Sequence, residues 1–299
     1  IMNLNTSIKN DYIYEYLSNT YDVKGVIHIS HGMAEHIGRY KWLIKKLNND
    51  GFHVVAIDHR GHGKRIKDNQ KGFFAEENGW ALVIDDLLLI IKETKKKYPN
   101  LKQYLLAHSM GSWIALGAMQ NKMSINGLIL SGSSKIPSSL LTLQSLLIRM
   151  QIIFFGKKGI SKFLDNITLG SYNKFFKPNR TNKDWISSDN TNVDNYIDDP
   201  LCGFMVTNGL WNDLANGMES VFDKKNYIHA DKSIPILIIS GSNDPVGENG
   251  KGVERLYIFL KNIFKNISIK LIEGARHEVF SEVDKEDNYL VLNKFLNKN

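Results

Sequence analysis

The sequence predicts an α/β protein with a mostly parallel sheet and helices on both faces. Short apolar segments alternate along the chain with segments of helical periodicity, which is typical of βαβ units. These segments are short and mostly apolar, as expected for strands that are buried on both faces of a parallel sheet. Most of them end in small or glycine residues, and the functional side chains of such sheets lie at the carboxyl ends of the strands.

The expected elements follow one another in a regular order. Helical periodicity is found at Arg39–Asn49, Asn78–Lys97 and Gly252–Lys265, and the first two segments stop at Gly51 and Pro99, residue types that commonly end helices. The segments with the composition of buried strands are Val26–Ser30, Val54–Asp58, Tyr104–Ala107, Leu128–Leu130, Ile236–Ile239 and Ile267–Ile272.

One long stretch interrupts this alternation. We interpret the chain as a single domain, residues 1–299, with an inserted helical cap at about residues 135–207. The cap begins with the densely apolar segment Pro137–Phe155. A membrane span is the alternative there, but the segment is short for that purpose and contains Arg149 and two glutamines. The apolar side chains could pack on the core or line an acyl channel, and we expect a channel wall to include residues from 140–147 and 152–155.

Composition excludes several classes of protein. Hydrophobic residues make up 42% and charged residues 23% of the 299 residues, as in ordinary globular proteins, which excludes disorder over the whole chain. The net charge of +7 comes from scattered basic residues, so we expect no nucleic-acid partner and at most transient association of the cap with an anionic membrane surface. The single cysteine, Cys202, excludes an intrachain disulfide and zinc sites built on several thiolates.

Cofactor and targeting motifs are also missing from the sequence. We find no H-E-x-x-H pattern and no G-x-G-x-x-G after a strand, so we expect neither a metal nor a dinucleotide cofactor. The first residues have no apolar segment of the kind found in secretory signals, and we therefore expect a cytoplasmic protein.

A candidate nucleophile lies in A-H-S-M-G, residues 107–111. Ser109 follows an apolar strand and opens a helical segment, which is the strand–turn–helix context of a nucleophile elbow. The tight turn requires small residues two positions before and after the serine, and Ala107 and Gly111 meet this requirement. The alternative is an ordinary serine that caps a helix.

A serine hydroxyl needs a base, and the base needs an orienting carboxylate. Asp244 lies in S-G-S-N-D-P after one predicted strand, and His277 lies in E-G-A-R-H after the next. The order serine, acid, histidine is the one found in elbow-containing hydrolases. We therefore expect Ser109, Asp244 and His277 to form a catalytic triad, although Asp244 alone reads as a turn residue and His277 alone as a loop residue.

The oxyanion formed during attack on a carbonyl requires two N–H donors. We expect them to be the backbone amides of Met110, which follows the nucleophile, and of Met33, in the H-G-M loop after an early strand. Gly32 lets this loop approach the site closely. We interpret His31 as a structural hydrogen-bonding residue rather than a catalyst.

Taken together, five motifs resemble the monoacylglycerol lipase and lysophospholipase branch of the α/β-hydrolases. They are H-G-M-A-E-H-I-G-R-Y (31–40), D-H-R-G-H-G (58–63), A-H-S-M-G (107–111), G-S-N-D-P (241–245) and G-A-R-H (274–277). The cap segments at 169–176, 184–187 and 199–204 look like those of bacterial members. Ala107 stands where relatives usually have glycine, and Lys64-Arg65 where many have a serine soon after the last glycine.

The resemblance implies an α/β-hydrolase fold and a serine hydrolase that cleaves esters of single-acyl-chain glycerolipids through an acyl-enzyme, without a cofactor. A short-chain carboxylesterase is the first alternative, and a non-catalytic ligand receptor on this fold is another. A third alternative, an aminopeptidase of the same fold, would need carboxylates in the cap to hold the substrate amine, for which Asp189, Asp194, Asp198 and Asp199 are available.

Overall fold

The computed structural model describes residues 10–299 and contains a seven-stranded sheet. The strand order is β1-β3-β2-β4-β5-β6-β7, and all neighbours are parallel except β1 and β3. The strands are β1 (Ile13–Tyr16), β2 (Gly25–Ser30), β3 (Phe52–Ile57), β4 (Lys102–His108), β5 (Gly127–Ser131), β6 (Ile236–Gly241) and β7 (Ile267–Ile272). The predicted mostly parallel sheet is thus confirmed, and the antiparallel edge strand β1 is an addition to it.

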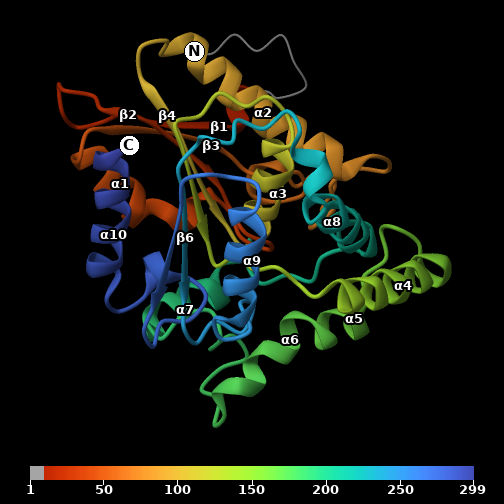
Figure 1. Cartoon of the computed structure of the whole chain (residues 1–299). Coiled ribbons are helices and arrows are strands. Elements are labelled where there is room, and N and C mark those ends of the chain that lie inside the picture. Colours follow the sequence, from red (N-terminus) through yellow and green to blue (C-terminus); the bar gives the residue numbers. More distant parts are fainter. Residues whose placement is uncertain (1–9) are drawn as a thin grey trace.

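Helices cover both faces of the sheet, as predicted. Helices α1 and α10 lie on one face, and α2, α3, α8 and α9 lie on the other (Figure 1). The helices are α1 (Lys41–Asn49), α2 (Gly79–Lys97), α3 (Met110–Met119), α4 (Ser138–Phe155), α5 (Lys162–Ile167), α6 (Leu169–Tyr172), α7 (Asn190–Asp198), α8 (Asn208–Val221), α9 (Lys251–Lys261) and α10 (Lys285–Lys298).

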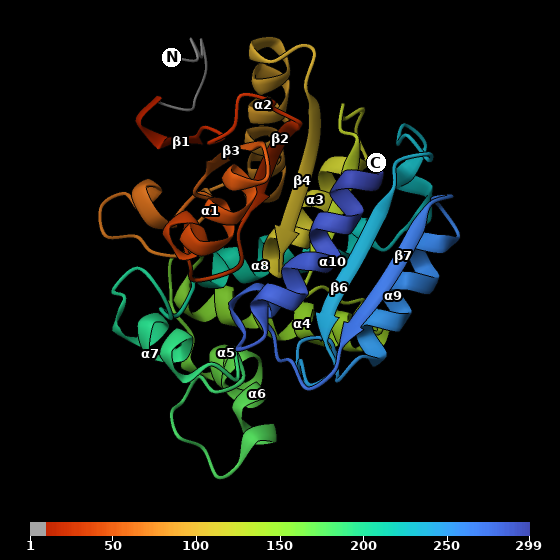
Figure 2. The ribbon, with the colours of Figure 1, turned by 90° about the vertical axis from the view of Figure 1, so that its left-hand side faces the viewer.

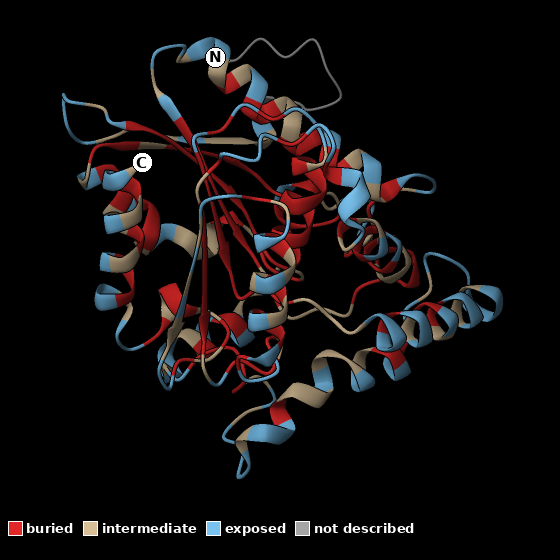
Figure 3. Cartoon of the chain, viewed as in Figure 1, coloured by how far each residue is buried: buried red, intermediate tan, exposed pale blue. Residues whose placement is uncertain are grey.

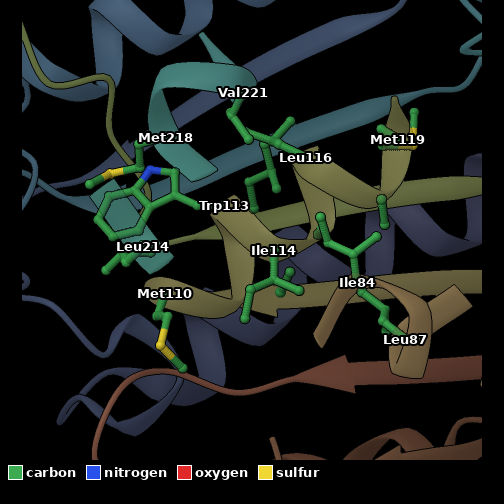
Figure 4. Close-up of a cluster of buried hydrophobic side chains, with 14 of the residues drawn as sticks. Ile84, Leu87, Met110, Trp113, Ile114, Leu116, Met119, Leu214, Met218 and Val221 are labelled. Carbon is green, nitrogen blue, oxygen red and sulfur yellow. The ribbon is translucent and has the colours of Figure 1, made fainter. Parts of the chain in front are cut away.

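The larger hydrophobic core is built around α3, all of whose residues are buried. Trp113 and Leu116 on α3 pack against α8 through Met218 and Val221, while Ile114 faces α2 (Figure 4). A helix with no exposed face needs apolar residues all round, which explains why the sequence from 110 to 119 is nonpolar apart from Ser112. This burial holds the first turn of α3, and therefore the residue that precedes it, in a fixed position.

The cap lies beyond the carboxyl ends of the parallel strands. Its residues form α4 to α7 between β5 and α8, and they contribute no strand to the sheet (Figure 2). Helix α8, which follows the cap, packs on α2 and α3. The cap therefore covers the edge at which functional side chains are expected.

Most residues of helix α4 are exposed (Figure 3), and several of these are large and apolar. Only Leu141, Ser145 and Ile148 are buried, and Gln144 and Ile148 line the cavity beside Ser109. The expectation that the wall draws on residues 140–147 is met by Gln144, but none of residues 152–155 lines it. Phe154 is 71% exposed. The prediction was wrong for that part because an apolar composition on both sides of a helix hides which side faces inward.

Helix α4 is also the one helix among residues 10–299 with the length and apolar composition needed to cross a membrane. A single helix of this kind is weak support for a span, because the helices of other proteins meet the same criteria.

Candidate active site

Ser109 lies in a sharp turn between β4 and α3. Its backbone has φ 52° and ψ −122°, a conformation that costs a residue with a side chain on the order of 1–3 kcal/mol. A hydrogen bond to the neighbouring strand stabilises the turn, because the Ser109 N–H donates to the carbonyl of Ser131 on β5 at 2.9 Å. This is the strained strand–turn–helix geometry expected from the sequence, and it presents the serine at the end of the strand.

Gly111 lets α3 come close to the end of β2. A Cβ at this position would lie 2.2 Å from the carbonyl oxygen of Ser30 and 2.5 Å from that of His31. No side chain fits in that space, so the sequence requirement for glycine after the serine has a direct steric cause. The same close approach brings the turn at Ser109 next to the loop that begins at His31.

Asp244 and His277 are joined by a hydrogen bond. His277 Nδ1 donates to Asp244 Oδ2 at 3.0 Å, and both residues are buried. Asp244 also accepts from Val246 N at 2.9 Å and from the Ser240 hydroxyl at 3.1 Å. Because the carboxylate can only accept, the Nδ1 atom carries the proton and Nε2 is left as the basic nitrogen.

The charge of Asp244 acts on the imidazole. Burial disfavours a charged His277, but the neighbouring carboxylate outweighs burial, and the pKa of His277 is raised above its ordinary value. A carboxylate that both orients the ring and stabilises its protonated form is what a general base in acyl transfer needs.

Ser109 and His277 lie in the same small region. The ring of His108, which precedes Ser109 in the chain, has its centroid 4.7 Å from that of His277. The ring of Trp185, which lines the cavity together with Ser109, has its centroid 5.2 Å from that of His277. Among the described residues no hydrogen bond joins the Ser109 hydroxyl to His277; such bonds are often long before substrate is bound.

Met33 and Met110 both line the cavity that contains Ser109. Met110 is the first residue of α3, where backbone N–H groups have no partner within the helix. The Met33 N–H has no acceptor among residues 10–299. Both amides are therefore free to donate to a ligand.

The cavity itself is lined mainly by apolar side chains. Trp113, Leu214 and Met218 line it from the core, and Ile148, Leu164 and Trp185 line it from the cap. Ser109 is thus at the wall of a pocket that suits an extended hydrocarbon group.

The four acidic residues of the cap that could hold a substrate amine lie outside the cavity. None of Asp189, Asp194, Asp198 and Asp199 lines this cavity. Asp189 caps α7, Asp194 pairs with Arg180, and Asp199 accepts from His36. The cavity lining, which lies entirely within the described residues, contains no carboxylate to hold an amine, and this weakens the aminopeptidase alternative.

The sequence did not reveal how the cap is fastened to the loop that carries His277. Arg276 donates to the carbonyls of Asp184 and Ser187, the latter at 3.1 Å. Glu282 accepts from Ser188 N at 2.8 Å and from Arg276 N at 2.6 Å. The arginine in G-A-R-H was visible as a motif residue, but its partners in the cap are remote in sequence.

A second group of charges was also missed. Arg39 donates to Glu278 at 2.6 Å and to Asn192 at 3.0 Å, and its Nε lies 3.9 Å from Glu35. Burial and the charge of Glu278 raise the pKa of Glu35 to about 7, against the opposing effect of Arg39. The sequence signal for this group was the E-H-I-G-R-Y string, in which Glu35 and Arg39 are four residues apart. A charged side chain that is buried requires a partner.

His36, Asp199 and Cys202 place potential metal ligand atoms within 4.8 Å of one another. Both ring nitrogens of His36 have partners, because Nδ1 accepts from Gly38 N at 3.1 Å and Nε2 donates to Asp199 at 2.9 Å. Burial raises the pKa of the Cys202 thiol, which favours its protonated form. We interpret the trio as a polar contact between the loop after β2 and the cap.

Comparisons with known proteins agree with this geometry. The profile of the family Hydrolase_4, described as serine aminopeptidase, S33, matches residues 21–284. The chain is 29% identical to monoglyceride lipase of Rattus norvegicus over 272 residues, covering 89% of this chain and 79% of that protein. It is 27% identical to phospholipase YtpA of Bacillus subtilis, covering 90% and 94%.

A similar structure is that of a thermostable carboxyl esterase from Bacillus coagulans in complex with glycerol. The TM-score is 0.86, the sequence identity is 28%, and the superposition covers 96% of this chain and 93% of that one.

Proposed function

The chain belongs to the Hydrolase_4 family of α/β-hydrolases, within the branch of serine hydrolases that includes monoglyceride lipases and lysophospholipases, and we propose that it hydrolyses carboxylic esters of single-acyl-chain glycerolipids. One observation carries the proposal, namely that the strained Ser109 opens onto an apolar cavity beside the Asp244–His277 pair. A hydrocarbon chain fits that lining, and the ester carbonyl would then lie at the serine.

In the proposed reaction the Ser109 hydroxyl attacks the ester carbonyl while His277 Nε2 takes up its proton. Asp244 holds the imidazole in the required tautomer and stabilises the imidazolium that forms. The amides of Met33 and Met110 donate to the oxyanion. His277 then returns the proton to the departing alcohol, and water, activated by the same imidazole, hydrolyses the acyl-enzyme.

The glycerol part of the substrate is supported by the similar proteins. Rattus norvegicus monoglyceride lipase is named for a glycerol ester, and the esterase from Bacillus coagulans was solved with glycerol. A lysophospholipid has the same single acyl chain with a charged head group, and it is the second substrate class we include in the proposal.

We further propose that the cap associates with a lipid surface while substrate enters. Helix α4 has a row of exposed apolar side chains at helical spacing, on the side opposite the buried Leu141 and Ile148. We call this row the α4 stripe; it consists of Leu143, Leu146, Met150, Ile153 and Phe154. Lys157 and Lys158 follow the helix and are exposed, and the net charge is +7. An exposed apolar stripe with basic neighbours suits an anionic bilayer.

The experiment that tests the proposed function compares esters with one head group and different acyl chains. We expect catalytic efficiency toward monoacylglycerols to rise steeply from two carbons to medium and long chains. Each buried methylene contributes about 0.8 kcal/mol, or roughly fourfold in efficiency. Substrates are kept below their micelle thresholds, and Ser109→Ala, which should also lose labelling by a fluorophosphonate, is the control.

The same assay separates the alternatives. Efficiency that peaks at two to four carbons would replace the lipase proposal with a short-chain carboxylesterase. Undiminished fluorophosphonate labelling of Ser109→Ala would place the nucleophile elsewhere. Lysophosphatidylcholine and lysophosphatidylglycerol of equal chain length then compare head groups.

A further inference from the structure

The loop His31-Gly32-Met33 lies directly against the proposed nucleophile. A Cβ placed on Gly32 would be 3.3 Å from Ser109 Cβ and 3.2 Å from the ring of His108. Met33, the next residue, lines the cavity with Ser109. The direction in which the Met33 N–H points therefore depends on how the peptide between Gly32 and Met33 is oriented.

The ring of His31 holds that peptide by its carbonyl. His31 Nδ1 lies 2.8 Å from the carbonyl oxygen of Gly32, and His31 Nε2 lies 2.9 Å from the backbone nitrogen of His59. The carbonyl can only accept and the His59 N–H can only donate. Both bonds form together only when the imidazole is neutral and carries its proton on Nδ1.

The surroundings of His31 keep it in that form. The side chain is fully buried, and burial lowers the pKa of His31 to about 4. Asp58 lies 3.9 Å from Nε2, but its oxygens accept from Ile37 N, Lys64 N and the Tyr14 hydroxyl. The backbone N–H of His59, in the loop after β3, therefore fixes the His31 tautomer that has its proton on Nδ1.

In a trans peptide the C=O and the N–H point in opposite directions. With the Gly32 carbonyl bonded to the His31 ring, the Met33 N–H points away from that ring, and Met33 lies on the cavity side of the loop. We infer that His31 is a positioning residue that fixes the orientation of the Gly32–Met33 peptide so that the Met33 N–H faces the oxyanion. This inference rests on the proposed function.

The preceding peptide is held as well. The N–H of Gly32 donates to the carboxylate of Glu35, which also accepts from the Tyr40 hydroxyl at 2.8 Å. Gly32 is therefore bonded on both sides, through its N–H by Glu35 and through its C=O by His31. A glycine would otherwise allow this peptide to rotate freely, and a rotated peptide would present a carbonyl where the oxyanion needs a donor.

Two substitutions separate the two ring nitrogens of His31. The amide nitrogen of asparagine takes the place of Nδ1, so His31→Asn keeps a donor for the Gly32 carbonyl and loses the acceptor for His59. The amide oxygen of glutamine takes the place of Nε2, so His31→Gln keeps the acceptor for His59 and loses the donor. Both are uncharged and remove the ring, which makes them matched.

We expect His31→Gln to lose on the order of 10²–10³-fold in kcat, the effect of removing one oxyanion donor, with KM little changed. We expect His31→Asn to stay within about tenfold of the wild-type kcat, although it loses ring volume and melts at a lower temperature. The affinity for an alkyl boronic acid, which forms a tetrahedral adduct with the serine, should fall in proportion to kcat. Rates are normalised to folded protein by circular dichroism and active-site titration.

The result that would overturn the inference is an equal loss of kcat in both variants, or a loss that follows the melting temperature instead of the retained donor. If His31→Gln does not fold, the boronic acid affinity and the kcat of His31→Asn test the inference alone. If His31 acted mainly through its bond to His59, both quantities would fall steeply in His31→Asn. Failure of the proposed function shows differently, as absence of ester hydrolysis by the wild-type protein.

Discussion

At the scale of single residues, the site depends on one buried charge beside one imidazole. Asp244 is fully buried, and its carboxylate has three hydrogen-bond donors in Ser240, Val246 and His277. Such a carboxylate stays in one orientation, and the ring of His277 follows it. The orientation of the proposed base therefore depends on residues that follow two neighbouring strands, β6 and β7.

A substitution at Asp244 should change both the rate and its pH dependence. His277 must be neutral to accept a proton, so turnover falls as the pH drops through its pKa, and the raised pKa places this acid limb above the ordinary value of about 6.5. In Asp244→Asn the stabilising charge is gone while burial remains. We expect the acid limb to move to lower pH and the plateau to fall by about 10³–10⁴-fold.

The pH profile of kcat/KM for a soluble ester measures both effects. Glu248→Gln is the matched control, because Glu248 lies close to Asp244 in the chain but pairs with Arg255. An acid limb that stays in place in Asp244→Asn, or a Glu248→Gln variant that is inactive, would assign the acid elsewhere.

At the scale of elements, strands and turns were more predictable than surfaces. Six strands, β2 to β7, were expected within about two residues of their bounds, because short apolar runs have few alternatives. The expectation of burial on both faces was wrong for β7, an edge strand in which no residue is buried. β1 was missed because Ile13–Tyr16 is a short, half-buried edge strand whose pairing with β3 is non-local. The inner side of α4 could not be predicted, since its outward side is equally apolar.

The exposed α4 stripe leads to a test of lipid-surface association. We expect Leu146→Asp with Phe154→Asp to reduce binding to vesicles of anionic phospholipid at least tenfold, because two exposed apolar side chains are replaced by charges that the bilayer repels. Hydrolysis of a water-soluble acetyl ester should be unchanged, since neither residue lines the cavity. Co-sedimentation with vesicles measures the binding.

The control for that experiment is Ile258→Asp. Ile258 is 61% exposed on α9, outside the cap, and Leu146 is 57% exposed, so Ile258→Asp is matched to the single variant Leu146→Asp, which is measured beside the double variant. Equal loss of vesicle binding in the control, or full binding by the α4 variant, would contradict a role for the α4 stripe.

At the scale of the whole molecule, Arg39 connects three parts of the chain that meet around the site. It lies beside Glu35 in the loop after β2, pairs with Glu278 next to His277, and donates to Asn192 in the cap. Its guanidinium also lies 4.9 Å from the ring centroid of Tyr196. The sequence placed Glu35 and Arg39 in a motif but could not show that two partners of Arg39 come from residues more than 150 positions away.

This group places the buried carboxylate of Glu35 and the partly buried carboxylate of Glu278 beside one guanidinium, and the excess negative charge destabilises the ionised form of Glu35. Burial and Glu278 raise the pKa of Glu35 to about 7, although Arg39 and the hydrogen bonds from Gly32 and Tyr40 act in the opposite direction. The folded protein therefore binds a proton at Glu35 more tightly than the unfolded chain, where the pKa is near 4.3. This contribution to stability is complete below pH 4.3 and is lost as the pH rises through about 7.

We expect the unfolding free energy of the wild type to fall by about 3 kcal/mol relative to that of Glu35→Gln as the pH rises from 4 to 8. Glutamine carries no titrating proton, keeps an oxygen for the Gly32 N–H, and leaves Arg39 paired with Glu278. Urea unfolding at a series of pH values measures the difference. Glu254→Gln, at an exposed position on α9, should show no such trend. A difference that is flat with pH would mean that the pKa of Glu35 in the folded protein equals that in the unfolded chain, because Arg39 balances the effects of burial and of Glu278.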